Sequence, residues 1–136
     1  MAQEDKIKRE IDRIGLVLAK LLGMLLHKPN QHEEAVKEVI QQMQDELDID
    51  LGRLPETDKE ELLQYLVKQK NFSNDHLRLF ANLLYETAGT GNDNNQQALL
   101  KSRALHIYEY IQANANGTLY LDVVYRIREL NESSPS

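Results

Sequence analysis

The four histidines are the residues whose side chains could bind a metal ion or transfer protons near neutral pH. They are His27, His32, His76 and His106. None belongs to a Glu-x-x-His or His-Glu-x-x-His pair, the spacings with which helices present ligands to iron or zinc. The chain has no cysteine, so thiolate metal sites, thiol nucleophiles and disulfides are excluded. We predict no metal site and no cofactor, and we expect histidine truncation to cost little stability unless the ring is buried.

A run of carboxylates could bind calcium, which prefers oxygen ligands. The run consists of Asp45, Glu46, Asp48 and Asp50. An EF-hand loop starting at Asp48 would need glycine at its sixth position and glutamate at its twelfth, whereas the chain has Arg53 and Lys59 there. The spacing favours a solvated loop over a calcium site.

The segment Gly89-Thr90-Gly91 could open a phosphate-binding loop. It lacks the lysine and the serine or threonine that would contact phosphate and magnesium, and no predicted strand precedes it. Nucleophile motifs such as Gly-x-Ser-x-Gly are also absent from the sequence. The segment therefore indicates a loop between helices, and the lack of a catalytic motif favours a non-enzymatic protein.

Composition and charge restrict the classes of partner. The chain has 136 residues, 41% of them apolar, which is enough for the core of one domain. Sixteen basic and 22 acidic residues give a net charge of -6, so we expect no nucleic-acid partner. The acidic excess is concentrated in residues 31–62, which carry eleven acidic and three basic side chains.

The most apolar stretch runs from Leu16 to Leu26 and is interrupted only by Lys20 and Gly23. It is shorter than the roughly 18 residues that a membrane-spanning helix needs. Acidic residues before it and His27-Lys28-Pro29 after it do not fit a secretory signal. We therefore expect a cytoplasmic protein, and we rank peripheral attachment to a membrane last among the possible functions.

The spacing of apolar residues predicts an all-α fold without strands, in a single domain over residues 1–136. About six helices are expected: a long N-terminal helix, then antiparallel helical hairpins over residues 31–130. The predicted segments are 3–27, 31–47, 57–71, 73–88, 95–113 and 118–130, followed by a frayed tail at 131–136. Thr57 and Glu60 form a predicted capping box, and Ser73 is a predicted N-cap.

The N-terminal helix carries an apolar seam with heptad spacing, which can pack against another helix. The seam consists of Ile7, Ile11, Ile14, Leu18, Leu21 and Leu25. Further apolar residues off the seam, from Leu16 to Leu26, predict that this half of the helix is covered on nearly all sides. The covering helices could belong to the same chain or to a partner. The candidate interaction residues are Ile14, Leu18, Leu21, Leu22 and Leu25.

Residues 75–130 resemble tetratricopeptide-like helical repeats. The resemblance rests on a helix with Leu84-Tyr85, a helix with the pattern Ala104-x-x-x-Tyr108-x-x-Ile111, and a further helix. It implies that Ala104 lets the paired helix approach and that Tyr108 fills the gap between neighbouring helices. It also implies peptide or protein binding, although no functional residue of the family falls on a matching position.

Two hypotheses for function follow. The first is a helical module that binds a protein partner or a second copy of itself. The second is a small-ligand-binding protein or an enzyme, with its pocket between the C-terminal helices near His106 and the tyrosines of that region.

Overall fold

The computed structural model describes residues 2–27, 32–88, 94–118 and 120–133. These residues form helices and connecting turns without a strand, so the predicted all-α class is confirmed. The helices are α1 (Ala2–His27), α2 (His32–Leu47), the 3₁₀ helix η2 (Leu51–Glu56), α3 (Lys59–Gln64), the π-helical turn η3 (Tyr65–Gln69), α4 (Asn74–Ala88), α5 (Asn94–Ala113) and α6 (Leu121–Ser133). The helix α6 continues to Ser133, three residues beyond the predicted end of the sixth segment, and the rest of the predicted frayed tail lies outside the described residues. The predicted loop at Gly89-Thr90-Gly91 lies outside the described residues.

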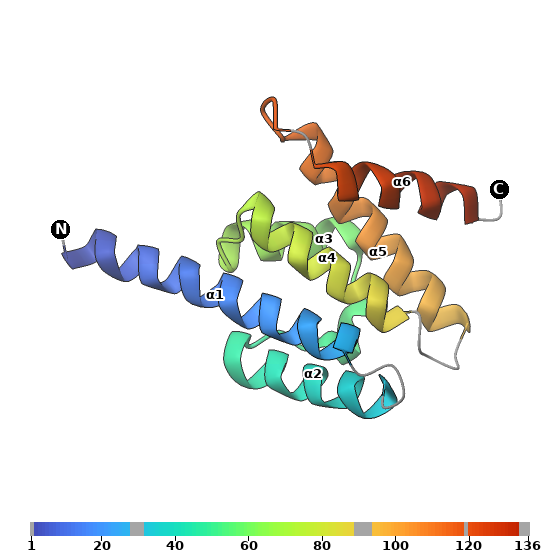
Figure 1. Ribbon diagram of the computed structural model, residues 1–136, viewed down its shortest axis with the longest axis horizontal. Coiled ribbons are helices and arrows are strands. Elements are labelled where there is room, and N and C mark those ends of the chain that lie inside the picture. Colours follow the sequence, from blue (N-terminus) through green and yellow to red (C-terminus); the bar gives the residue numbers. More distant parts are fainter. Residues whose placement is uncertain (1, 28–31, 89–93, 119, 134–136) are drawn as a thin grey trace.

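The main helices lie side by side in the order α2, α1, α4, α5 and α6 (Figure 1). The hairpin of α1 and α2 packs through α1 onto α4, and α4 pairs in turn with α5. α3, which directly precedes the π-helical turn η3, contacts α5. The first half of α1 extends past the ends of the neighbouring helices (Figure 1).

The part of the heptad seam of α1 that begins at Ile14 lies in the core of the chain, whereas Ile11 is 39% exposed. Ile14, Leu18, Leu21 and Leu25 are buried, and Leu22 is partly buried. Burying one leucine side chain contributes about 1.5–3 kcal/mol, so this seam is a major part of the core. Helices of the same chain do not cover this half of α1 on all sides. Leu16 is 72% exposed and Leu26 is 54% exposed, because α2 and α4 cover only the opposite face.

The packing of α4, α5 and α6 is centred on α5. Ala104, Tyr108 and Ile111 of α5 are fully buried. The Tyr108 hydroxyl donates a hydrogen bond to Asn82 of α4, and burial raises the pKa of that hydroxyl. The small side chain of Ala104 leaves room for a neighbouring helix, while the aromatic ring one turn later fills space.

The start of α3 differs from the predicted capping box. The Asp58 carboxylate accepts hydrogen bonds from the backbone amides of Glu60 and Glu61, at 3.1 and 3.4 Å. Thr57 instead ends η2: its amide donates to the Leu54 carbonyl, and its hydroxyl donates to the Arg53 carbonyl. Aspartate caps helices at least as well as threonine, so the cap moves by one residue.

The start of α4 confirms the predicted cap. The Ser73 hydroxyl accepts from the His76 amide at 3.3 Å, and Nδ1 of His76 accepts from the Ser73 amide at 3.2 Å. Because Nδ1 is an acceptor, Nε2 carries the proton and donates to the Ile11 carbonyl of α1, 2.9 Å away. The ring is only 4% exposed, so the expectation of a dispensable histidine does not apply to His76.

Candidate functional site

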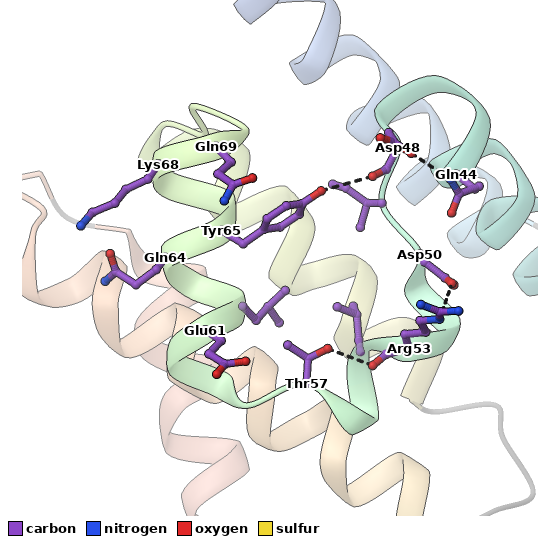
Figure 2. A pocket seen from close by; sticks show the side chains of 13 residues that line it. Gln44, Asp48, Asp50, Arg53, Thr57, Glu61, Gln64, Tyr65, Lys68 and Gln69 are labelled. Carbon is purple, nitrogen blue, oxygen red and sulfur yellow. Dashed lines mark hydrogen bonds and ion pairs between the residues drawn. The ribbon is translucent and has the colours of Figure 1, made fainter.

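A groove of about 870 Å³ lies between the turn after α2 and the helix formed by α3 and η3 (Figure 2). One wall follows Asp48 to Arg53, and the other follows Glu61 to Gln69. The volume falls within the roughly 300–1,000 Å³ of ligand pockets in proteins.

The first wall forms because α2 ends abruptly at Asp48. This residue takes a left-handed backbone with φ 55°, and the next amide, that of Ile49, donates to the Met43 carbonyl. The carboxylate of Asp50 then caps η2 by accepting from the Gly52 amide at 3.0 Å. Two members of the carboxylate run thus have structural roles: Asp48 follows the end of α2, and Asp50 caps the start of η2. In the described part of the chain, no three His, Cys, Asp or Glu side chains lie close enough together to hold a metal ion.

The second wall contains a π-helical turn, in which the Lys70 amide donates to the Tyr65 carbonyl five residues earlier. Such turns often occur at functional sites, because the extra residue changes where side chains point. Asn71, with φ 58°, ends the turn. The Tyr65 hydroxyl crosses the groove and donates to the Asp48 carbonyl at 3.4 Å, which links the two walls (Figure 2).

The groove combines an apolar floor with polar walls. Ile49, Leu54 and Leu62 line it and are themselves buried. On the second wall, several polar side chains make no hydrogen bond or ion pair with any other described residue; these are Glu61, Gln64, Lys68 and Gln69. They remain available for contacts with a ligand.

A smaller cleft of about 340 Å³ lies between α3 and α5. It is lined by Glu60, Leu63, Gln64, His106, Glu109 and Tyr110. Nε2 of His106 lies 2.8 Å from Oε1 of Glu60, which links the two helices. This cleft contains the histidine of the small-ligand hypothesis, but its second wall is α3 rather than a C-terminal helix.

A polar cluster joins α6 to α4 beside α5. The guanidinium of Arg126 lies 3.9 Å from the centre of the Tyr85 ring and 3.1 Å from the Glu129 carboxylate. The Tyr85 hydroxyl donates to the same carboxylate. This hydrogen bond, followed by the positive charge of Arg126, holds the pKa of Glu129 below its ordinary value, and it raises the pKa of Tyr85. We interpret the cluster as a structural link between helices.

The sequence-predicted interaction candidates lie apart from both hollows. Four of them, Ile14, Leu18, Leu21 and Leu25, meet in the core and are not available to a partner in this fold. The groove residues were not predicted. The available signal was the break at Gly52 and Pro55, which indicates that two helices fold back beside each other. It does not indicate that a hollow remains between them.

The chain matches no known protein family, no curated protein and no solved structure. The resemblance of residues 75–130 to tetratricopeptide-like repeats therefore stays a prediction. Among the described residues, no helix combines the length and the apolar character that crossing a membrane requires.

Proposed function

We propose that this protein is a helical interaction module that binds a segment of a partner protein in the groove between η2 and the α3–η3 helix. The observation that carries the proposal is the wall of unpaired polar side chains above an apolar floor. A bound segment would bury apolar groups against the floor and replace water as the hydrogen-bonding partner of the exposed polar side chains on the wall.

The residue types on the walls suit a peptide backbone. Carboxamides both donate and accept hydrogen bonds, as do the N–H and C=O groups of an extended chain, and Gln44, Gln64 and Gln69 line the groove. Tyr65 adds an aromatic surface of the kind enriched at protein interfaces. Asp48, Asp50 and Glu61 are nearly balanced by Arg53 and Lys68, so the groove itself has little net charge.

The proposal is tested by quantitative capture of partners from the native cell. A Gln64→Ala/Gln69→Ala variant is expected to retain at most about a tenth of the partner held by the wild type, because two backbone contacts are lost. The matched control, Gln112→Ala/Asn131→Ala, removes two exposed carboxamides from α5 and α6 and should capture as much as the wild type. Equal capture by both variants would reject the groove as the binding site.

Self-association is a second candidate function, favoured by the outer face of α1. Leu16, Ala19, Gly23 and Leu26 follow each other at heptad spacing on this face. A glycine inside a helix costs about 1 kcal/mol relative to alanine. A Cβ added at Gly23 would meet only the His27 ring, at 3.9 Å, so the described part of this chain gives no reason for glycine there. Close approach of α1 from a second copy would provide one.

A further inference from the structure

The cleft between α3 and α5 has a charge that selects a ligand. Glu60 and Glu109 contribute two carboxylates, and neither lysine nor arginine is among the described residues that line it. One oxygen of Glu60 faces His106, while the Glu109 carboxylate makes no hydrogen bond or ion pair with another described residue. Glu60 belongs to the most acidic part of the sequence, residues 31–62, whereas Glu109 lies on α5.

The other lining groups suit a long side chain with a cationic end. Leu63 is buried at the base, and the half-buried ring of Tyr110 forms part of the wall. Lysine and arginine place their methylene stems along apolar surface while the charged group reaches polar partners. A guanidinium or ammonium also binds favourably over an aromatic ring.

The cleft lies beside the groove, because Gln64 lines both hollows and α3 forms the ridge between them. An α-helix with its side chains is about 10–12 Å across. An extended chain advances about 3.3 Å per residue. A segment that crosses the ridge would therefore place a residue in the cleft about three positions away from those in the groove.

We propose that this cleft binds a lysine or arginine side chain of the partner segment, so that the partner is recognised by a basic residue beside its groove-binding part. This inference rests on the proposed function of the groove. Charge complementarity between the carboxylates of Glu60 and Glu109 and the cation supplies the selectivity, since hydrogen bonds between ionised groups are about twice as strong as neutral ones.

The test is an NMR titration of the full ¹⁵N-labelled chain with N-acetyl-argininamide. The matched ligand is N-acetyl-citrullinamide, which has nearly the same shape without the charge. We expect saturable shifts of the amide signals of Glu60, Gln64 and His106 with the arginine compound, and at least about tenfold weaker binding of the citrulline compound. A Glu60→Gln/Glu109→Gln variant should lose the difference between the two compounds.

The control variant Glu33→Gln/Glu34→Gln removes the same charge from exposed residues in the first turn of α2. It should bind the arginine compound as the wild type does. If both variants bind the arginine compound equally weakly, the effect comes from overall charge and the inference fails. It also fails if the wild type binds the two compounds equally well, or if the shifted signals lie away from the cleft. Failure here leaves the groove as a binding site, because the capture experiment can be repeated with Gln69→Ala alone, and Gln69 lines the groove but not the cleft.

Discussion

His76 shows how a single buried polar side chain can connect two helices. Its ring nitrogens bond to the Ser73 amide and the Ile11 carbonyl, so both are satisfied inside the protein. The ring also packs edge-on against Phe72, with 5.6 Å between ring centres. The residue therefore caps α4 and fixes its position against α1.

We predict that His76→Ala lowers the free energy of unfolding by about 2–4 kcal/mol, because it leaves a cavity and an unpaired Ser73 amide. Urea denaturation measures the loss. His27→Ala removes an exposed ring and should stay within about 0.5 kcal/mol of the wild type. Equal unfolding midpoints for the two variants would contradict the buried role of His76.

The two faces of α1 predict opposite outcomes for the same substitution. Leu18→Asp places a carboxylate without a partner in the core, and we expect a loss of several kcal/mol, about half of a small domain's 5–15 kcal/mol. Leu16→Asp, on the 72% exposed side chain, should change monomer stability by less than about 0.5 kcal/mol. Denaturation at low protein concentration compares them. A stable Leu18→Asp variant of wild-type size would show that α1 is not part of the core.

At the scale of elements, short helical segments depend on their ends. α3 spans only Lys59–Gln64 before the π-helical turn, so a large share of its backbone amides lies in the first turn. Asp58 accepts from two of these amides. The second wall of the groove therefore depends on this one carboxylate.

We expect Asp58→Ala to cost about 1 kcal/mol of unfolding free energy, the usual value for loss of an N-cap. Thr57→Ala should cost less, since it removes only the hydroxyl bond to the Arg53 carbonyl. Thermal unfolding of both variants compares the two. A larger loss for Thr57→Ala would restore the capping box expected from the sequence.

The link between α4 and α6 predicts a pH dependence. The pKa of Glu129 is lower in the folded protein than in the unfolded chain, where it is about 4.3. Its contribution is therefore fully present above the unfolded pKa and is lost as the pH falls through the folded value. Because the side chain is half-exposed, solvent screening limits this contribution to at most about 1 kcal/mol.

Glu129→Gln should accordingly be slightly less stable than the wild type at pH 7, and the difference should shrink on acidification below about pH 4. Urea unfolding midpoints of both proteins at pH 7 and below about pH 4 measure this difference in stability. Glu132→Gln, an exposed neighbour on α6, serves as the control and should show no such convergence. A difference that grows at low pH would reverse the sign and contradict the assignment.

At the scale of the whole molecule, a row of helices leaves the outer faces of some members uncovered. α1 exposes Leu16 and Leu26, and α6 exposes Leu121 (58%) and Tyr125 (63%). Both faces could contact another molecule. Of the two, only the α1 face has apolar residues at heptad spacing together with a glycine, Gly23, at a position where the described residues of this chain leave room for a larger side chain.

We predict that sedimentation across a dilution series shows self-association of the wild type, and that Leu16→Asp/Leu26→Asp abolishes it by placing carboxylates in the interface. Leu121→Asp/Tyr125→Asp makes an equivalent change on α6 and should leave the association intact. A wild type that stays monomeric at high concentration would rule out the α1 face. Loss of association in the α6 variant alone would also rule it out.

Much of the secondary structure was predictable because its signals are local. The apolar periodicity identified six helical segments, and Ser73 was recognisable as a cap from its position before a helix. The all-α class follows from the same patterns. The acidic excess of residues 31–62 is likewise a property of the sequence, and it includes Glu60, one of the two carboxylates of the cleft.

Only the tertiary structure decided which surfaces are buried and which are hollow. A heptad seam on α1 fits a partner helix from any source, and the choice of α2 and α4 depends on contacts between distant segments. His76 has a structural role because α4 packs where the carbonyl of Ile11, 65 positions earlier in the chain, can accept a hydrogen bond from its ring. The groove exists because the left-handed turn at Asp48 and the π-helical turn at Tyr65 set two walls apart. Such distances depend on how whole elements pack, which residue spacing along one segment does not encode.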